Sequence, residues 1–220
     1  AAVDAAAAGD VILICAGTYN ESVDLPDVGR DITLEGVGTV VISPTTGAAV
    51  FADNGPYAGN ITLINLDATS ADVIALEFTS GINGNLVISG SSASGANLAG
   101  LSAGPVTGEV WITNTVFADN EWAGADITSE RPLADCAIPD DIPLAISLYG
   151  VEASGNTGEG ITAGTRCGNI VVANSTSDDN GSDGFLLSSF ETNSGVIVTG
   201  SSADENGDPP QGSGSGFNIQ

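Results

Sequence analysis

The chain of 220 residues contains no histidine, lysine or methionine, and its basic residues are three arginines. Without histidine or lysine it cannot form a Ser-His-Asp triad, a Cys-His pair, an imidazole proton relay or a lysine Schiff base. Aromatic residues make up only 5% of the chain. No apolar run reaches 18 residues, so no membrane-spanning helix is expected. These absences favour a protein that is not an enzyme.

Acidic residues dominate the charge of the chain. There are 28 of them, and the net charge is −25. Such a surface repels nucleic acids and anionic membrane headgroups, because both are bound through cationic contacts. A hydrated acidic surface is typical of a secreted or halophilic protein, and capture of cations is the alternative.

Six segments of the chain begin in the same way, with aliphatic residues two positions apart. This is the period of a strand with one buried face. An Asn or Gly follows four positions after each start, and these residue types adopt left-handed backbone conformations most cheaply. The segments start, at spacings of 25, 24, 36, 24 and 26 residues, at Ile61, Leu86, Val110, Ile146, Ile170 and Val196. A repeat of this length predicts a solenoid.

Asparagines recur at fixed places within these repeats. Stacked Asn side chains can hydrogen-bond along a solenoid and satisfy buried amides. One predicted ladder lies ten residues after the starts, at Asn120, Asn156, Asn180 and Asn206. A second, interrupted by glycine, is predicted at Asn65, Asn114 and Asn174.

The N-terminal region is rich in alanine. Residues 1–10 predict a short helix ended by Gly9 that covers the open edge of the first coil. A strand is expected at residues 11–17, with Cys15 as a small core residue. These segments, with the following Ala-Gly-Thr-Tyr-Asn-Glu and Ile-Thr-Leu-Glu-Gly, resemble the beginning of right-handed parallel β-helices of the pectate-lyase-like superfamily. The resemblance implies an all-β, right-handed parallel β-helix of about eight coils with an N-terminal capping helix, forming a single domain over residues 1–220.

The enzyme motifs of similar β-helices are absent. The related glycoside hydrolases carry Gly-His-Gly and Arg-Ile-Lys, and neither occurs here. The related esterases use pairs of Gln, but this chain has only Gln211 and Gln220. The related lyases use calcium on acidic residues with an Arg or Lys base, which acids beside Arg131 or Arg166 could imitate. A calcium-dependent lyase-like enzyme therefore stays open as an alternative.

Residues 130–143 interrupt the repeat and contain three prolines, so a loop is expected there. It is either a projecting binding element or a flap over exposed core. A disulfide between Cys136 in this loop and Cys167 in the next coil would tie the loop to the solenoid, which favours an extracellular location. Sequons that fit a glycosylated surface protein stand at Asn20, Asn60, Asn174 and Asn180.

Aligned repeats also bring acidic residues together. Asp178 falls over Asp204, and Asp179 over Glu205, at a strand spacing of ~4.8 Å. Because like charges this close repel, they are either splayed into water or neutralised by a cation. Carboxylate oxygens suit calcium, so these four residues are a candidate calcium site. No other cofactor is expected.

The outward residue after each start is uncharged along most of the chain. Together with a nearby tyrosine, these residues form a predicted contact stripe of Val87, Trp111, Tyr149, Val171 and Ile197. Such a stripe on an acidic protein indicates a contact surface. Alternatively, residues 130–143 cover it.

The last repeat ends with Phe217 in register with Phe185, and no polar cap follows it. We therefore expect further chain or a second subunit to stack there, and head-to-tail stacking would build a filament. The sequence favours an extracellular structural or adhesive β-helix that associates with itself or with a cell-surface or glycan partner. The alternative is a carbohydrate-active module centred on the acidic loops and on Trp111, Trp122 and Tyr149.

Overall fold

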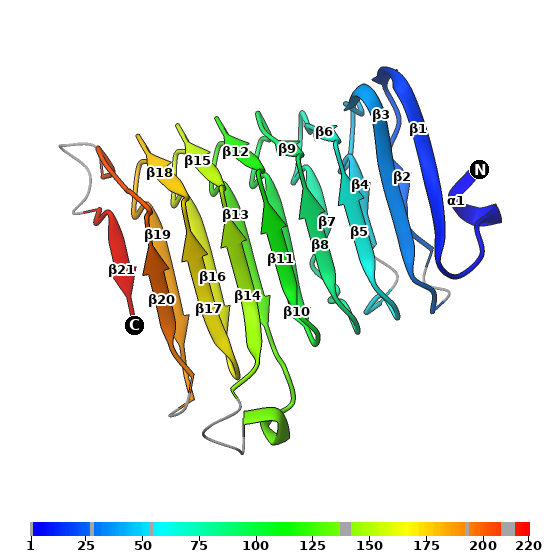
Figure 1. Cartoon of the computed structure of the whole chain (residues 1–220). Helices are drawn as coiled ribbons and strands as arrows, with labels where there is room; N and C mark the ends of the chain where they lie inside the picture. The colour runs from blue at the N-terminus through cyan, green and yellow to red at the C-terminus, as the bar shows by residue number, and fades with distance from the viewer. Residues whose placement is uncertain (1, 27–28, 53–54, 137–141, 192–193, 208–213) are drawn as a thin grey trace.

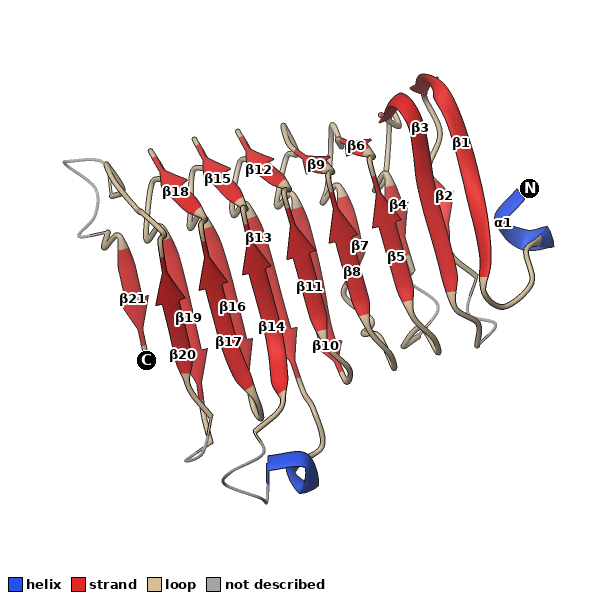
Figure 2. Cartoon of the chain, in the orientation of Figure 1, coloured by secondary structure: helices blue, strands red, loops and turns tan. Residues whose placement is uncertain are grey.

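The computed structural model is a parallel β-helix (Figures 1 and 2), which confirms the predicted fold class. It describes residues 2–26, 29–52, 55–136, 142–191, 194–207 and 214–220. In these residues the helices are α1 (Ala2–Ala5) and a 3-10 turn, η1 (Leu133–Cys136). The predicted N-terminal helix is therefore shorter than residues 1–10.

The strands of successive coils line up on three faces, and the ladders between coils are parallel. Two long strands, β1 (Asp10–Tyr19) and β3 (Ile32–Ile42), run across the first two faces. Face 1 consists of β5 (Ile61–Ile64), β8 (Leu86–Ser89), β11 (Val110–Thr113), β14 (Leu144–Tyr149), β17 (Asn169–Ala173) and β20 (Val196–Thr199). Face 2 consists of β6 (Asp67–Ala68), β9 (Ser92–Ala93), β12 (Val116–Ala118), β15 (Glu152–Ser154) and β18 (Thr176–Asp178). Face 3 consists of β2 (Val23–Asp24), β4 (Val50–Phe51), β7 (Leu76–Phe78), β10 (Leu101–Val106), β13 (Ala125–Ser129), β16 (Ile161–Thr165), β19 (Phe185–Ser189) and β21 (Phe217–Ile219).

The core is formed by the inward residues of these strands. Alternation along each strand places every second residue inside, and the registers align equivalent residues of successive coils. The coil starts at Ile61, Leu86, Val110, Ile146 and Ile170 are all fully buried. The apolar spacing in the sequence thus generates a continuous column of aliphatic side chains.

The predicted Asn ladder lies at the turn between faces 2 and 3. Asn120 Nδ2 donates to Asn156 Oδ1 at 2.9 Å, Asn156 Nδ2 to Asn180 Oδ1 at 2.8 Å, and Asn180 Nδ2 to Asn206 Oδ1 at 2.9 Å. Each of these acceptor oxygens also receives the backbone N–H of the preceding Asn. The first ladder is therefore confirmed.

The second set of asparagines behaves differently. Asn65 has a positive φ of 54°, and Gly90 of the next coil has 58°. A Cβ on Gly90 would lie 2.5 Å from Asn65 Oδ1. The same relation links Asn114 with Gly150. Each Asn side chain therefore covers a glycine of the following coil, so this turn does not form an Asn–Asn ladder.

The N-terminal end is covered only in part. Arg30 holds α1 through hydrogen bonds to the carbonyl oxygens of Ala6 and Val3, the latter at 2.8 Å. An open, mainly apolar cavity of about 590 Å³ lies between α1 and the first coil. The core assignment of Cys15 is wrong, since this thiol is free and exposed. Alternation in β1 turns Ile12 and Ile14 towards the core and leaves Cys15 outside.

The insertion leaves the solenoid after β13 and returns at β14 (Figure 1). Cys136 and Cys167 form a disulfide that connects η1 to the following coil. Ser194 of the next coil accepts a hydrogen bond from the Gly168 N–H at 2.9 Å, and its Oγ lies 3.8 Å from Cys136 Sγ. Cys136 of the insertion thus contacts residues of two successive coils.

Candidate functional site

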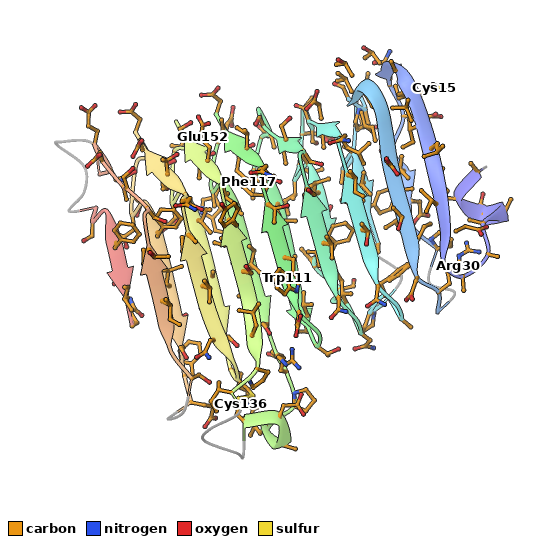
Figure 3. The ribbon with its side chains drawn as sticks, viewed as in Figure 1. Cys15, Arg30, Trp111, Phe117, Cys136 and Glu152 are labelled. Atoms are coloured by element: carbon orange, nitrogen blue, oxygen red, sulfur yellow. A yellow bond between two sulfur atoms is a disulfide. The ribbon has the colours of Figure 1, made fainter. Side chains whose placement is uncertain are left out.

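Face 1 carries the predicted contact stripe. Trp111 and Ile197 are 40% and 53% exposed, whereas Val87 and Val171 are half-buried. Ser147 pairs with Trp111 and interrupts the stripe, because it is only 9% exposed. Trp111 lies on the open surface of β11 (Figure 3). The stripe is therefore discontinuous, and its largest side chain is exposed to solvent.

Trp111 and Tyr149 are close neighbours on this face. Thr113, two residues after Trp111, pairs with Tyr149 on the adjacent strand β14. One strand spacing and two residues along the strand place the Cα atoms of Trp111 and Tyr149 roughly 8 Å apart. Tyr149 is 49% exposed. Beside them, Thr113 Oγ1 donates to Ser89 Oγ at 2.9 Å, so two exposed rings border a pair of hydroxyl groups.

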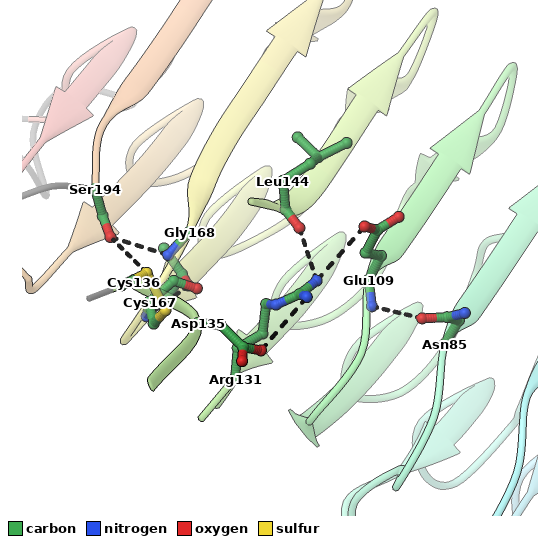
Figure 4. Close-up of polar contacts among 10 residues, drawn as sticks. Asn85, Glu109, Arg131, Asp135, Cys136, Leu144, Cys167, Gly168 and Ser194 are labelled. Carbon is green, nitrogen blue, oxygen red and sulfur yellow. Dashed lines mark hydrogen bonds and ion pairs between the residues drawn. A yellow bond between two sulfur atoms is a disulfide. The ribbon is translucent and has the colours of Figure 1, made fainter. Parts of the chain in front are cut away.

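The indole of Trp111 is hydrogen-bonded to a charged network at the edge of face 1. Its Nε1–H donates to Glu109 Oε2 at 2.8 Å. Glu109 Oε1 lies 3.5 Å from Arg131 Nη1, and the same guanidinium donates to the Leu144 carbonyl oxygen at 3.0 Å. Arg131 Nη2 lies 3.6 Å from Asp135 Oδ2 in η1. The contacts of Arg131 with Glu109, Asp135 and Leu144 are drawn in Figure 4. Through Glu109, the insertion thus supports the aromatic site from the edge of face 1.

Glu109 occupies a repeated position that sequence reasoning missed. Asp31, Asn60 and Asn85 each precede a coil start, and each accepts the backbone N–H of the equivalent residue in the next coil, at 2.9, 2.8 and 2.8 Å. Glu109 is the last member of this ladder before the insertion, and its carboxylate contacts Trp111 and Arg131. The available signal was a polar residue directly before Ile32, Ile61, Leu86 and Val110.

Trp122 belongs to another part of the surface. It is 47% exposed and lies in the turn between β12 and β13. There the backbone N–H of Trp122 donates to the Leu98 carbonyl oxygen at 3.0 Å. The structure therefore groups Trp111 with Tyr149 and leaves Trp122 outside this site.

The candidate calcium residues lie at the turn beyond face 2. The Asp204 N–H donates to Asp178 Oδ1 at 2.8 Å, so this carboxylate caps the next coil. Asp179 and Glu205 have positive φ angles of 57° and 53° and border a groove beside the Asn ladder. Among the described residues, no group of three or more His, Cys, Asp or Glu side chains could hold a metal ion. Calcium binding stays a prediction.

The sequons differ in accessibility. Asn20 and Asn174 are exposed. Asn60 Nδ2 donates to Asp31 Oδ1 at 2.9 Å. Asn180 is 1% exposed and hydrogen-bonded within the Asn ladder, which leaves no room for a glycan in the folded chain. Asn180 is therefore rejected as a glycosylation site.

A second polar feature, also missed by sequence reasoning, lies on face 3. Asp126 points outward from β13 into a hollow of about 260 Å³ that is also lined by Ser102, Gly104 and Thr128. Burial raises the pKa of the Asp126 carboxyl, and the negative charge of Glu159 raises this pKa further. Alternation along the strand predicts that the Asp126 side chain points outward. It does not predict that this side chain is partly buried.

The raised pKa makes Asp126 a source of pH-dependent stability. Ionisation is disfavoured in the folded state, so this group lowers the free energy of unfolding as pH rises from the ordinary aspartate range through the raised pKa. We expect Asp126→Asn to stabilise the protein at neutral pH by a few tenths of a kcal/mol, because the carboxyl is partly exposed. The gain should disappear below the ordinary aspartate pKa.

Urea unfolding between acidic and neutral pH measures this difference. Glu77→Gln, two strands away on the same face, controls for the loss of one negative charge. An equal gain in both variants would show that general charge repulsion, and not the burial of Asp126, is responsible.

Comparison with known proteins reveals a distant structural similarity. No family model and no curated protein matches the chain. It is similar to the Azotobacter vinelandii mannuronan C-5 epimerase AlgE6 A-module, at 18% sequence identity and a TM-score of 0.43. The similarity covers 94% of this chain and 70% of that chain. None of the helices in the described residues is long and apolar enough to cross a membrane.

Proposed function

We propose that the chain is an extracellular, non-catalytic β-helix that adheres to glycans through face 1. The observation that carries this proposal is the adjacent, exposed pair of Trp111 and Tyr149 on strands that contain no charged residue. The apolar C–H faces of sugar rings stack on aromatic rings, whose amphipathic character suits contacts at a wet surface. A flat sheet can accommodate an extended polymer.

The absence of charged residues from the six later strands of face 1 supports a contact role. None of the strands β5, β8, β11, β14, β17 and β20 contains a charged residue, although the chain carries a net charge of −25. An uncharged, partly apolar surface of this kind on an otherwise acidic protein indicates an interaction site. The hydroxyl groups of Ser89 and Thr113 lie beside the rings and can hydrogen-bond to sugar hydroxyls.

The hydrogen bond of the Trp111 indole supports binding energetically. Because Glu109, which is itself paired with Arg131, already accepts the Trp111 indole N–H, a ligand has less motion of this ring to restrict. Preorganisation of this kind lowers the entropic cost of association. The Cys136–Cys167 disulfide fits an oxidising, extracellular location, and the lack of histidine and lysine favours a non-catalytic role.

Removal of the indole tests this function. We expect Trp111→Ala to weaken binding to immobilised polysaccharides by roughly tenfold or more, as for aromatic anchors at other interfaces. Affinity electrophoresis through gels containing individual polysaccharides measures the effect. Trp122→Ala removes a similarly exposed indole elsewhere and should leave binding unchanged.

Two results would contradict the proposal. One is the absence of retardation by every polysaccharide tested. The other is an equal loss of polysaccharide affinity in Trp111→Ala and Trp122→Ala, which would show that binding does not depend on face 1.

End-to-end self-association is a second candidate. Ile12 and Ile14 are inward residues of the first coil and are only partly buried, and Ile219, an inward residue of the last described coil, is 55% exposed. Phe217 stacks on Phe185 with ring centroids 5.0 Å apart and is only partly buried. Assembly through these ends would leave face 1 free, and sedimentation of the chain over a range of concentrations would reveal it.

A further inference from the structure

The edge of face 1 beside Trp111 is acidic. Glu109 and Asp135 side chains are 37% and 41% exposed, whereas the Arg131 side chain is only 16% exposed. These three residues together carry one net negative charge. The carboxylates are therefore the more accessible charges next to the aromatic pair.

The nearby cation is already engaged. The Arg131 guanidinium contacts Glu109, Asp135 and the Leu144 carbonyl oxygen. Arg30 holds α1 at the N-terminal end, and Arg166 is exposed in the turn between β16 and β17, two strands from Trp111. An anionic sugar stacked on Trp111 would thus meet two exposed carboxylates and a guanidinium that is already paired with them.

We infer that face 1 binds polymers of unacetylated amino sugars, whose rings stack on Trp111 and Tyr149 while their ammonium groups contact Glu109 and Asp135. This inference rests on the proposed function and names its ligand class. Charge complementarity carries the choice, because a net charge of −25 attracts a polycation and repels a polyuronate. The aromatic pair directs the polycation to face 1.

Three oligosaccharides of equal length test the ligand class. A β-1,4-linked glucosamine hexamer is cationic, its N-acetylated form is neutral with the same ring and linkage, and a β-1,4-linked uronate hexamer is anionic. By calorimetry we expect the glucosamine hexamer to bind at least about tenfold more tightly than the neutral form, and the uronate to bind most weakly. The preference should shrink as salt screens the charges.

Glu109→Gln distinguishes the effect of the Glu109 charge from the effect of the Trp111 ring position. The amide oxygen can still accept the Trp111 indole N–H, so binding of the N-acetylated hexamer should persist. Binding of the glucosamine hexamer should fall several-fold towards the neutral value. Glu77→Gln on face 3 removes the same charge at a distance and should have little effect.

The outcomes distinguish the inference from the function. Equal affinity for the cationic and neutral hexamers, or a preference for the uronate, would overturn the ligand class but leave glycan binding by face 1 intact. Glucosamine binding that survives Trp111→Ala would show unspecific attraction to the acidic surface and also overturn the inference. Failure of all three hexamers, together with all polysaccharides, would remove the proposed function itself.

Discussion

Replacement of Asn156 by alanine should lower the free energy of unfolding by about 3–5 kcal/mol, because it leaves several buried polar groups without partners. Asn156 is 2% exposed and lies in the middle of the Asn ladder. Its Oδ1 accepts from the backbone N–H and Nδ2 of Asn120, and its Nδ2 donates to Asn180 Oδ1 and to the Phe117 carbonyl oxygen at 3.1 Å. Urea unfolding followed by circular dichroism measures the loss.

Asn206→Ala is the matched control for this prediction. Asn206 is the last described member of the same ladder and is half-buried, so water can replace part of its hydrogen bonding. We expect a loss of about 1 kcal/mol there. If Asn156→Ala cost no more than Asn206→Ala, the ladder would not contribute through buried hydrogen bonds.

The sequence was sufficient to predict the fold because each coil repeats the same backbone requirements. Aliphatic alternation at Ile61 and its equivalents defines one buried side, and Asn or Gly four residues later permits the positive φ at the turn. The Asn120 ladder followed from the same alignment. Cys15 was assigned wrongly because an apolar run does not show which alternate residues face inward in a coil at the end of the solenoid.

The site was predictable only in part. The stripe residues follow from strand alternation, but the orientation of the Trp111 indole depends on how the insertion returns Arg131 to Glu109. Nothing in the periodicity determines that contact, because residues 130–143 lie outside the repeat. The partial burial of Asp126 likewise depends on neighbouring coils that form a hollow around Gly104.

Loss of the Cys136–Cys167 disulfide should have the other large effect. The cysteines are 31 residues apart, and the loop-closure model predicts a loss of about 3–4 kcal/mol in the free energy of unfolding. Alanine is the suitable replacement, because Cys167 is fully buried and Cys136 is 7% exposed. Urea unfolding of the double alanine variant, and of the wild type under reducing conditions, measures the loss.

The same variant also tests whether the disulfide supports the aromatic site. In a Trp122→Phe background Trp111 is the remaining tryptophan, and its emission reports the contact with Glu109. If the disulfide holds the insertion so that Arg131 can reach Glu109, loss of the disulfide should shift the Trp111 emission to the red and weaken glycan binding. Cys15→Ala removes the free, exposed thiol and should change neither property. A destabilised variant with unchanged Trp111 emission and unchanged binding would restrict the disulfide to stabilising the fold, and the ion pairs of Arg131 alone would then hold the site.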